Sequence, residues 1–316
     1  MNPATPPCTL ISLNTRTLIR VSGTDALMFL QGQLTQDLQR LQHQQWQWAA
    51  HCSPKGRMLA SFLLWAQDEA FWLDTGELMS AAILQRLRRY VLRSQVVLEE
   101  QRDHRHRLGL VGDVDTLLAA VGLPPPPPPG HWDEVQGLTR LALSPRRLML
   151  LDAPQSASAS TPWTLLHQTL SAQCPWGDTR VWDGAAVQEG IAEITLQTQE
   201  EWVPQMLNWD LIGGISFNKG CYTGQEIVAR SHYLGKIKRR TLRFSSVREC
   251  APGDPVYRCA DPTHMVGKVA WVGKTPAGAV ELLAVLPWEE QQDQCLTLAP
   301  ESPALVALPL PYDLPR

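Results

Sequence analysis

The sequence predicts an α+β body followed by an all-β unit. Before residue 235, segments with the apolar spacing of helices alternate with runs that are typical of strands. After it, short β-rich segments are separated by Gly and Pro turns, a pattern typical of a small barrel or sandwich. With 316 residues and a hydrophobic fraction of 44%, the chain can form two or three packed units.

The first expected elements lie near the N-terminus. Residues 18–21 are typical of a buried strand, and the apolar residues between 26 and 34 follow the spacing of a helix. Ser22 and Asp25 are three positions apart, which suits a capping box at the start of that helix.

The middle of the body contains a turn, a strand, a helix and two irregular segments. We expect the turn at 53–56, the strand over 58–64, and the helix over 79–92. The proline run 124–129 cannot join a packed helix and predicts an extended, exposed connection, with docking to an SH3-like partner as the alternative. The Ser-, Ala- and Pro-rich segment 153–162 predicts a loop.

We place the domain boundary at residue 235. Residues 1–235 form the body, expected to hold two subdomains with the proline-rich connection 124–130, and residues 236–316 form the barrel. The basic segment 236–240 is expected to be a solvated lead-in to the barrel. The strands of the second part are expected at 241–244, 255–258, 266–272 and 279–286.

Composition excludes several classes of protein. A net charge of −3 disfavours a globally basic nucleic-acid binder, so direct nucleic-acid binding is not expected. Seven scattered cysteines without paired short spacings argue against a secreted disulfide scaffold and against a four-cysteine zinc site, and we assign no metal. There is no secretory signal pattern and no apolar run near the roughly 20 residues that span a bilayer. We therefore expect a cytoplasmic protein that does not enter membranes.

The segment Asn218–Arg230 carries the strongest chemical signal. Thr223 and Glu226 have the T-x-x-E spacing of a capping box, and Tyr222 and Ile227 the spacing of a hydrophobic staple. Both signals predict a helix from about residue 224 to about residue 233.

This helix would place Cys221 just before its positive end, two residues from Lys219. Both neighbours favour the thiolate over the thiol, so Cys221 and Lys219 are our candidate catalytic pair. Gly220 and Gly224 would let a ligand or partner approach the backbone. The alternative is a small buried cysteine that fills a turn.

The run K-G-C-Y-T-G-Q-E at 219–226 resembles the hallmark segment of the YgfZ family, folate-binding relatives of the glycine cleavage T-protein that are linked to iron–sulfur protein maintenance and tRNA modification. Four further stretches fit the family in the same order: 21–37, 55–57, 190–208 and 213–217. The resemblance covers most of the chain and is weakest in the proline-rich middle.

The resemblance implies a T-protein-like α+β body around a central, folate-sized opening, followed by a C-terminal all-β barrel. It also implies that the protein binds tetrahydrofolate or another reduced folate. Glu189 matches the folate-contacting glutamate of the T-protein pattern, and a carboxylate can accept from the two adjacent donors of the pterin ring. Tyr222, Gln225 and Glu226 complete our set of candidate folate contacts.

One departure from the T-protein pattern concerns catalysis. T-proteins carry an acidic D-D pair shortly after the glycine of the second block, where this chain has Gly56 and then Ala60 and Ser61 without an acidic pair. Aminomethyl transfer that needs that carboxylate is therefore doubtful, and whether the protein is an enzyme stays open.

Three functions remain, and we choose the first. It is a tetrahydrofolate-binding accessory protein for assembly or repair of iron–sulfur enzymes, which supports tRNA modification indirectly and has those enzymes as clients. The second is a folate-dependent one-carbon transferase, which the missing carboxylates disfavour. The third is a tRNA-binding modification factor, which the acidic net charge disfavours.

Overall fold

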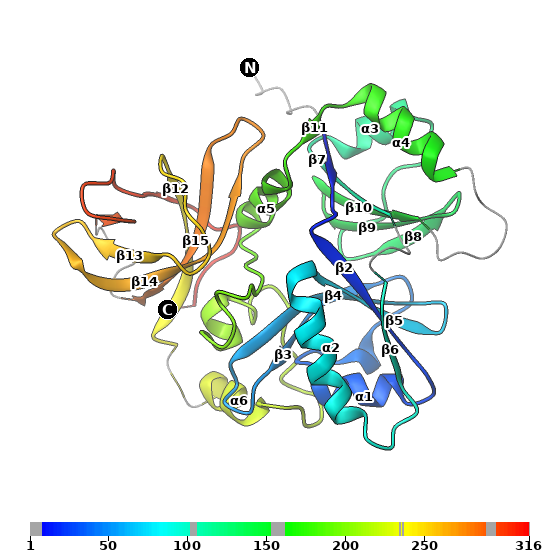
Figure 1. The fold of residues 1–316 in the computed structure, drawn as a ribbon, viewed down its shortest axis with the longest axis horizontal. Coiled ribbons are helices and arrows are strands. Elements are labelled where there is room, and N and C mark those ends of the chain that lie inside the picture. The colour runs from blue at the N-terminus through cyan, green and yellow to red at the C-terminus, as the bar shows by residue number, and fades with distance from the viewer. Residues whose placement is uncertain are drawn as a thin grey trace.

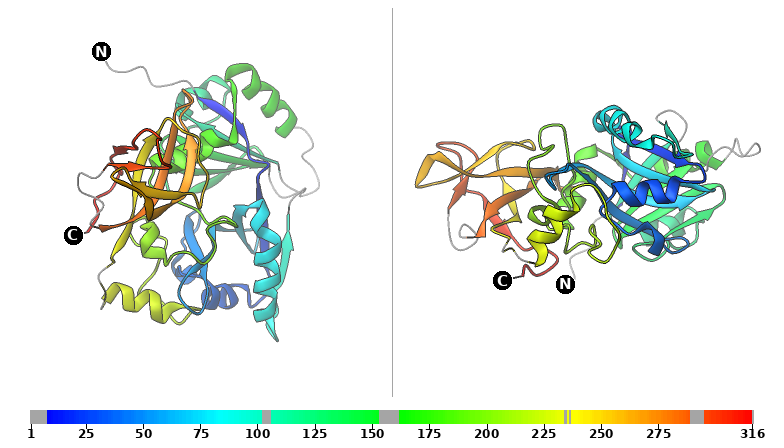
Figure 2. Two further views of the ribbon diagram at one scale, coloured as in Figure 1. Left: turned by 60° about the vertical axis from the view of Figure 1, so that its left-hand side comes forward. Right: turned by 90° about the horizontal axis from the view of Figure 1, so that it is seen from below.

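The structure is a computed structural model that describes residues 8–101, 106–152, 162–233, 235, 237–288 and 295–315. Two mixed α/β units and a curled β-sheet make up the molecule (Figure 1). Figure 2 shows the sheet of the C-terminal part beside the two N-terminal sheets from two further directions. None of the helices in the described ranges is long and apolar enough to cross a bilayer.

The first unit is a five-stranded antiparallel sheet. Its order is β3 (Trp46–Cys52), β4 (Met58–Gln67), β5 (Ala70–Gly76), β2 (Arg16–Ser22) and β6 (Val97–Glu100). The helices α1 (Ala26–Gln33) and α2 (Glu77–Val91) pack on this sheet. The predicted strand, turn and helix positions of this region are confirmed. The capping box is not, because Asp25 is the N-cap residue and its carboxylate accepts from the Gln95 amide instead.

The second unit is a six-stranded sheet. Its strands, in spatial order, are β11 (Trp176–Gly177), β1 (Thr9–Ser12), β7 (Arg107–Val111), β10 (Arg147–Asp152), β9 (Leu138–Ser144) and β8 (Trp132–Val135). Only the β1–β11 pair is parallel. The helices α3 (Val114–Ala120) and α4 (Pro162–Gln173) cover one side, where leucines from strands and helices share a core.

The proline run connects α3 to β8 as an extended segment, as predicted. The buried Arg140 anchors its start, because its guanidinium donates to the carbonyls of Pro124 and Pro125 and pairs with Asp133. The predicted loop at 153–162 lies outside the described residues except for Pro162, which begins α4.

The C-terminal part is a six-stranded antiparallel sheet that curls into a half-barrel. Its order is β16 (Leu296–Thr297), β13 (Pro255–Arg258), β14 (Asp261–Lys274), β15 (Val280–Pro287), β12 (Arg239–Ser246) and β17 (Val306–Leu308). All four strands predicted here are confirmed, and the sheet forms a half-barrel where the sequence predicted a barrel. The edge strands β16 and β17 are short and pair inward only, so the sheet stays open.

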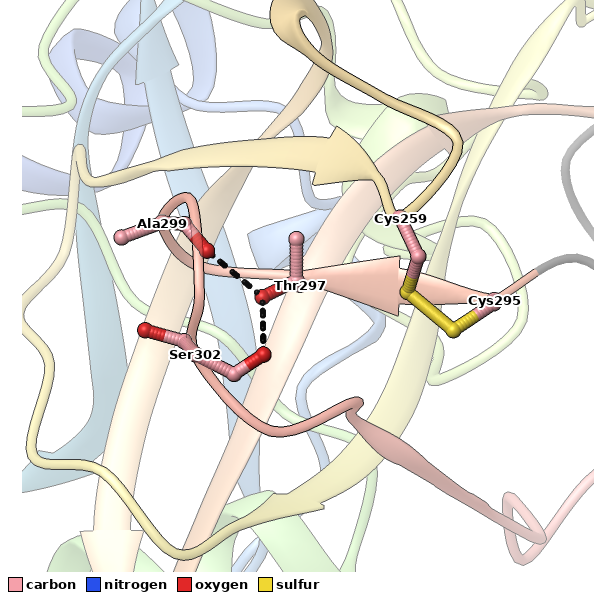
Figure 3. Close-up of a disulfide and its surroundings, with 5 residues drawn as sticks. All are labelled: Cys259, Cys295, Thr297, Ala299 and Ser302. Atoms are coloured by element: carbon pink, nitrogen blue, oxygen red, sulfur yellow. Dashed lines mark hydrogen bonds between the residues drawn. A yellow bond between two sulfur atoms is a disulfide. The ribbon is translucent and has the colours of Figure 1, made fainter.

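A disulfide joins Cys259 and Cys295, 36 positions apart, where β13 ends and β16 begins (Figure 3). This bond is not predicted by the sequence, because the two cysteines have no short paired spacing.

The helix α5 (Thr179–Gln188) lies where the half-barrel meets the rest of the molecule (Figure 1). It packs against β14 and β15 on one side and against β1 and β7 on the other. Gly184 makes this possible, because a Cβ atom there would lie only 2.0 Å from the Lys274 carbonyl oxygen. The domain boundary at 235 stays a prediction.

Candidate functional site

Cys221 lies in an irregular segment that leads into α6 (Gln225–Tyr233), and its side chain is exposed. The segment is fixed at its start by the strand-like residues around Thr35. The Ser216 amide donates to the Thr35 carbonyl, and the Thr35 hydroxyl donates to the carbonyl of Gly214. The thiol is therefore presented to solvent on a loop whose backbone is held to the first unit.

Lys219 holds this loop to the end of α1. Its residue is only 9% exposed, and its ammonium donates to three backbone carbonyls, those of Gln31 at 2.7 Å, Leu34 at 2.6 Å and Gln36 at 2.8 Å. Burial lowers the pKa of this ammonium to about 8, against the opposing effect of Asp37. All three N–H donors are used, so Lys219 acts as a clamp between two distant segments.

Tyr222 and Gln225 complete the clamp. The Tyr222 ring is buried with the Lys219 Nζ 5.0 Å from its centre, and burial raises the pKa of its phenol. The Gln225 amide lies 3.4 Å from the Lys219 carbonyl, to which it donates. The structure thus brings together Lys219, Tyr222 and Gln225, whereas Glu226 points to solvent on α6.

The start of α6 corrects one prediction. In the described part of the chain, neither Thr223 nor Glu226 makes a side-chain hydrogen bond, so the capping box is absent. Gly224 precedes the helix with a φ of +81°, and a Cβ there would lie 2.3 Å from the Ser53 carbonyl oxygen. The helix therefore begins at a close crossing of two backbones, which only glycine permits. The predicted extent of the helix is confirmed.

Glu189 lies elsewhere, in the wall of a cavity of about 490 Å³. Three parts of the molecule meet around this cavity: the β7 and β9–β10 region, helix α5, and the half-barrel, through its β14–β15 turn and the residues after β17. Most of the wall is apolar or aromatic and includes Val111, Val181, Ala185, Pro276, Pro311 and Tyr312. The polar groups come from Ser144, Arg146, Gln188 and Glu189.

The Glu189 carboxylate is paired on one side. Its Oε2 lies 2.5 Å from Nη2 of the buried Arg147, an ion pair without the alignment of a hydrogen bond. The Arg147 guanidinium in turn lies 5.0 Å from the ring centre of Trp182 on α5. The Glu189 side chain is still 21% exposed. Arg147 thus orients the Glu189 carboxylate, and the partly exposed side chain lines the cavity.

The candidate residues therefore fall in two places. None of Lys219, Cys221, Tyr222, Gln225 and Glu226 lines the cavity beside Glu189. Figure 1 shows α5 in the middle of the molecule and α6 at its lower edge. A wider hollow of about 710 Å³ at the end of α2, lined by Asp25 and 92–94, contains none of the predicted site residues.

Ala60 and Ser61 lie in the interior of β4. Ala60 is buried, and the Ser61 hydroxyl accepts from the Ile194 amide at 2.9 Å. Neither position carries a carboxylate.

A buried ion network around Arg16, which the sequence did not predict, lies in the same part of the fold. Arg16 donates to Asp74 at 2.6 Å and to both oxygens of Glu193 at 2.9 and 3.0 Å. Burial and the nearby Glu193 carboxylate raise the pKa of Asp183, on α5, to about 7. Asp74 and Glu193 lie 58 and 177 positions from Arg16, so no local sequence spacing predicts these ion pairs.

The basic segment before β12 is only partly a solvated lead-in. Lys238 and Arg239 are exposed. Arg240 is buried and pairs with both carboxylate oxygens of Asp210, at 2.6 and 2.9 Å, which corrects the prediction for this residue. Within the described ranges, no group of three or more His, Cys, Asp or Glu side chains is arranged to hold a metal ion.

Comparison with known proteins identifies the family. The chain is 30% identical over 315 residues to the tRNA-modifying protein YgfZ of Yersinia pestis (strain Pestoides F), covering 98% of this chain and 93% of that protein. The chain belongs to the YgfZ family. Its identity to the YgfZ protein of Yersinia enterocolitica is 29% with the same coverage. No family model matches the sequence.

The fold is that of the glycine cleavage T-protein. The aminomethyltransferase T of Bartonella henselae superposes with a TM-score of 0.75 at 17% sequence identity, over 96% of this chain and 86% of that structure. The expectation of a T-protein-like α+β fold is confirmed, with the curled half-barrel in place of a closed barrel.

Proposed function

We propose that this YgfZ-family protein binds a reduced folate and serves, in the cytoplasm, as an accessory protein for assembly or repair of iron–sulfur enzymes. Through those client enzymes it supports tRNA modification, in line with the name of its relatives. The cavity beside Glu189 is the observation that carries the folate part of the proposal.

The cavity has the size and chemistry that a folate needs. A volume of about 490 Å³ lies within the usual range of small-molecule sites, roughly 300–1,000 Å³. Its apolar wall suits the flat pterin and benzoyl groups, and the Glu189 carboxylate suits the pterin donors. Because Arg147 occupies Oε2, we assign the ligand contact to the other carboxylate oxygen. Arg146, exposed and in the same wall, suits the carboxylates of the glutamate tail.

A bound reduced folate would supply a one-carbon carrier, and the residues of this chain would orient it and exclude water. The carboxylates that a T-protein-like transfer needs are replaced by Ala60 and Ser61. We therefore propose binding without aminomethyl transfer.

Cys221 supplies the second half of the proposal. An exposed thiol on a loop clamped by Lys219 can engage a thiol or iron–sulfur group of a client, because sulfur is the ligand that such clusters use. Cys221 does not line the cavity beside Glu189, so folate binding and client contact can be tested independently of each other.

Two matched carboxyl-to-amide variants test where the folate binds. Glu189→Gln should weaken tetrahydrofolate binding by one to two orders of magnitude, since a charge-assisted hydrogen bond contributes roughly 1.5–3 kcal/mol. Glu226→Gln, on the exposed face of α6, should leave the affinity unchanged. Isothermal titration calorimetry at one ionic strength measures both, and thermal unfolding checks that each variant is folded.

The reverse result, with Glu226→Gln weakened and Glu189→Gln unchanged, would move the folate to the Cys221 segment. Equal affinities for all three proteins would reject both contacts. Steady turnover of an aminomethyl donor in the presence of tetrahydrofolate would reject the proposal of binding without transfer.

A further inference from the structure

We infer that Cys259 and Cys295 form a reversible thiol–disulfide site that controls the wall of the Glu189 cavity. Control passes through the C-terminal strap, which we define as residues 295–312. The ligand of the cavity and the cytosolic setting of the disulfide rest on the proposed function above, whereas the coupling of the disulfide to the strap rests on the contacts described below.

The disulfide is accessible and lies at the weakest edge of the half-barrel. Both cysteines are exposed, and the bond joins the end of β13 to the start of β16 (Figure 3). Disulfides of cytosolic proteins are usually transient, catalytic or redox-sensing, because cellular thiols keep cysteines reduced. A bond in this position can be reached by a reductant without unfolding the sheet.

Few other contacts hold the start of the strap. β16 pairs with β13 through only two residue pairs, Tyr257–Thr297 and Arg258–Leu296. The Cys259 amide donates to the Cys295 carbonyl at 2.8 Å. The Thr297 hydroxyl donates within the strap, to the carbonyls of Ala299 and Ser302, so this hydroxyl adds nothing to the attachment of β16 to β13 (Figure 3).

The strap joins the core of the half-barrel to the cavity wall. Leu296, Leu298 and Leu305 are buried in the half-barrel core, and β17 then pairs with β12. Beyond β17 the chain reaches the cavity, where Pro311 and Tyr312 line the wall with Glu189. No residue between the disulfide and Tyr312 lies outside the described chain, so the path is continuous.

Tyr312 is the residue through which the strap shapes the cavity. Its hydroxyl donates to the Gly190 carbonyl at 2.7 Å and accepts from the Asn208 amide at 3.3 Å. Gly190, directly after Glu189, has a φ of +70°, and a Cβ there would lie 2.6 Å from the Tyr312 hydroxyl. A strap that loosens would withdraw Tyr312 from the backbone beside the proposed folate contact.

The chemistry balances with a cellular dithiol as the reductant. One thiolate of a thioredoxin-class dithiol attacks a sulfur of the Cys259–Cys295 bond, and the resulting mixed disulfide is resolved by the second thiol. Two electrons and two protons pass to Cys259 and Cys295, and the dithiol becomes a disulfide. Glutathione disulfide reverses the reaction by the same exchange, with release of two glutathione thiols.

Reduction removes the covalent constraint, so only the two β16–β13 residue pairs and the leucine core then hold the start of the strap, while the β17–β12 pairs and the bonds from Arg248 to Ser302 and from Arg243 to the Pro309 carbonyl still hold its later part. The strap then opens more often, and the apparent Kd of the cavity rises in inverse proportion to the closed fraction. We expect the oxidised protein to bind the cavity ligand more tightly, by about tenfold if the reduced strap is closed a tenth of the time.

The test compares the full chain in its oxidised form, after reduction with a phosphine, and after re-oxidation with glutathione disulfide. Amide hydrogen exchange of 296–308 and of 190 reports the strap, and calorimetry with tetrahydrofolate reports the cavity. Cys259→Ser/Cys295→Ser should behave as the reduced protein does in either condition. Cys250→Ser, a cysteine of the same half-barrel outside the bond, should respond to reductant as the wild type does.

Faster exchange and weaker binding on reduction, both restored by oxidation, support the inference. Unchanged exchange in 296–308 would overturn it, and so would faster exchange with equal tetrahydrofolate affinity in both forms. If no form binds tetrahydrofolate while exchange at residue 190 follows the redox state, the strap inference stands and the proposed folate function fails.

Discussion

The ammonium of Lys219 illustrates how a single side chain can position a reactive loop without touching the reactive atom. The last carbonyls of a helix have no partner within the helix, and those around the end of α1 accept from Lys219. A cation at a helix C-terminus is also favoured by the helix dipole. The lysine of the K-G-C motif is therefore best understood as a structural anchor for the cysteine that follows two residues later.

Replacing Lys219 by Met should destabilise the protein by about 2–4 kcal/mol, since two buried carbonyls and one partly buried carbonyl lose their donor while the apolar stem is retained. Urea unfolding measures the difference. Lys55→Met, at an exposed position of the turn beside α6, serves as the control and should change stability by no more than about 0.5 kcal/mol. Equal stabilities of the two variants would contradict the clamp.

Asp183 predicts a specific dependence of stability on pH. Its pKa of about 7 in the folded protein lies above the ordinary 3.8, so the folded state binds this proton more tightly than the unfolded state does. The stabilising contribution of that proton is complete below about pH 4 and is lost as the pH rises through about 7. Asp183→Asn does not titrate, so its stability relative to wild type should increase from pH 4 to pH 7. Unfolding free energies measured across that range check this, and a constant difference would contradict it.

At the scale of elements, two glycines in helices differ in how closely their surroundings pack. Gly184 in α5 lies against the β14 backbone, whereas a Cβ on Gly32 in α1 would meet nothing within 4 Å. Only the first glycine is required by packing.

Gly184→Ala should therefore lower the unfolding free energy by about 2–3 kcal/mol, because the Lys274 backbone cannot move aside without shifting the half-barrel. Gly32→Ala should raise it by roughly 0.5–1 kcal/mol, the ordinary gain of alanine over glycine in a helix. Denaturant unfolding of both variants measures the pair. A stabilised Gly184→Ala variant would show that α5 is free to move on β14.

The start of α6 shows where sequence patterns for elements succeed and fail. The extent of this helix was predicted correctly from Thr223 and Glu226, although neither side chain caps it. The close crossing of Gly224 with Ser53, 171 positions earlier (224 − 53), fixes the start, and such a distant segment cannot be identified from local spacing. The strand at 255–258 was predicted to the residue, because its Gly and Pro boundaries are local.

At the scale of the whole molecule, the accessory role and RNA binding make opposite predictions. Cys221→Ser should keep fold and expression but fail to restore the activity of an iron–sulfur enzyme in a deletion strain, because the hydroxyl lacks the nucleophilicity and soft-metal affinity of the thiolate. A variant in which the exposed Lys238 and Arg239 are replaced by Ala should restore the activity of that enzyme in the deletion strain, as the wild-type protein does. Arg240 is left unchanged, since it is buried against Asp210.

Enzyme activity in the complemented strain is measured beside tRNA binding at two salt concentrations. A direct RNA binder would lose a strongly salt-dependent interaction when those cations are removed. Full rescue by Cys221→Ser together with failure of the Lys238→Ala/Arg239→Ala variant would favour RNA binding over our proposal.

The sequence by itself determined the features that local chemistry controls: the α+β body, the helices and strands with clear periodicity, the K-G-C-Y-T-G-Q-E motif, and the loss of the acidic pair at Ala60 and Ser61. Only the tertiary structure decided that Lys219 clamps α1, that Arg147 orients Glu189, and that the final sheet stays open and is crosslinked at its edge. Those contacts join residues from 36 to 188 positions apart. Packing and the free-energy cost of leaving buried charges unpaired select the partners in these contacts. Both effects act between elements that are distant in the sequence, so they produce no periodic pattern along the chain.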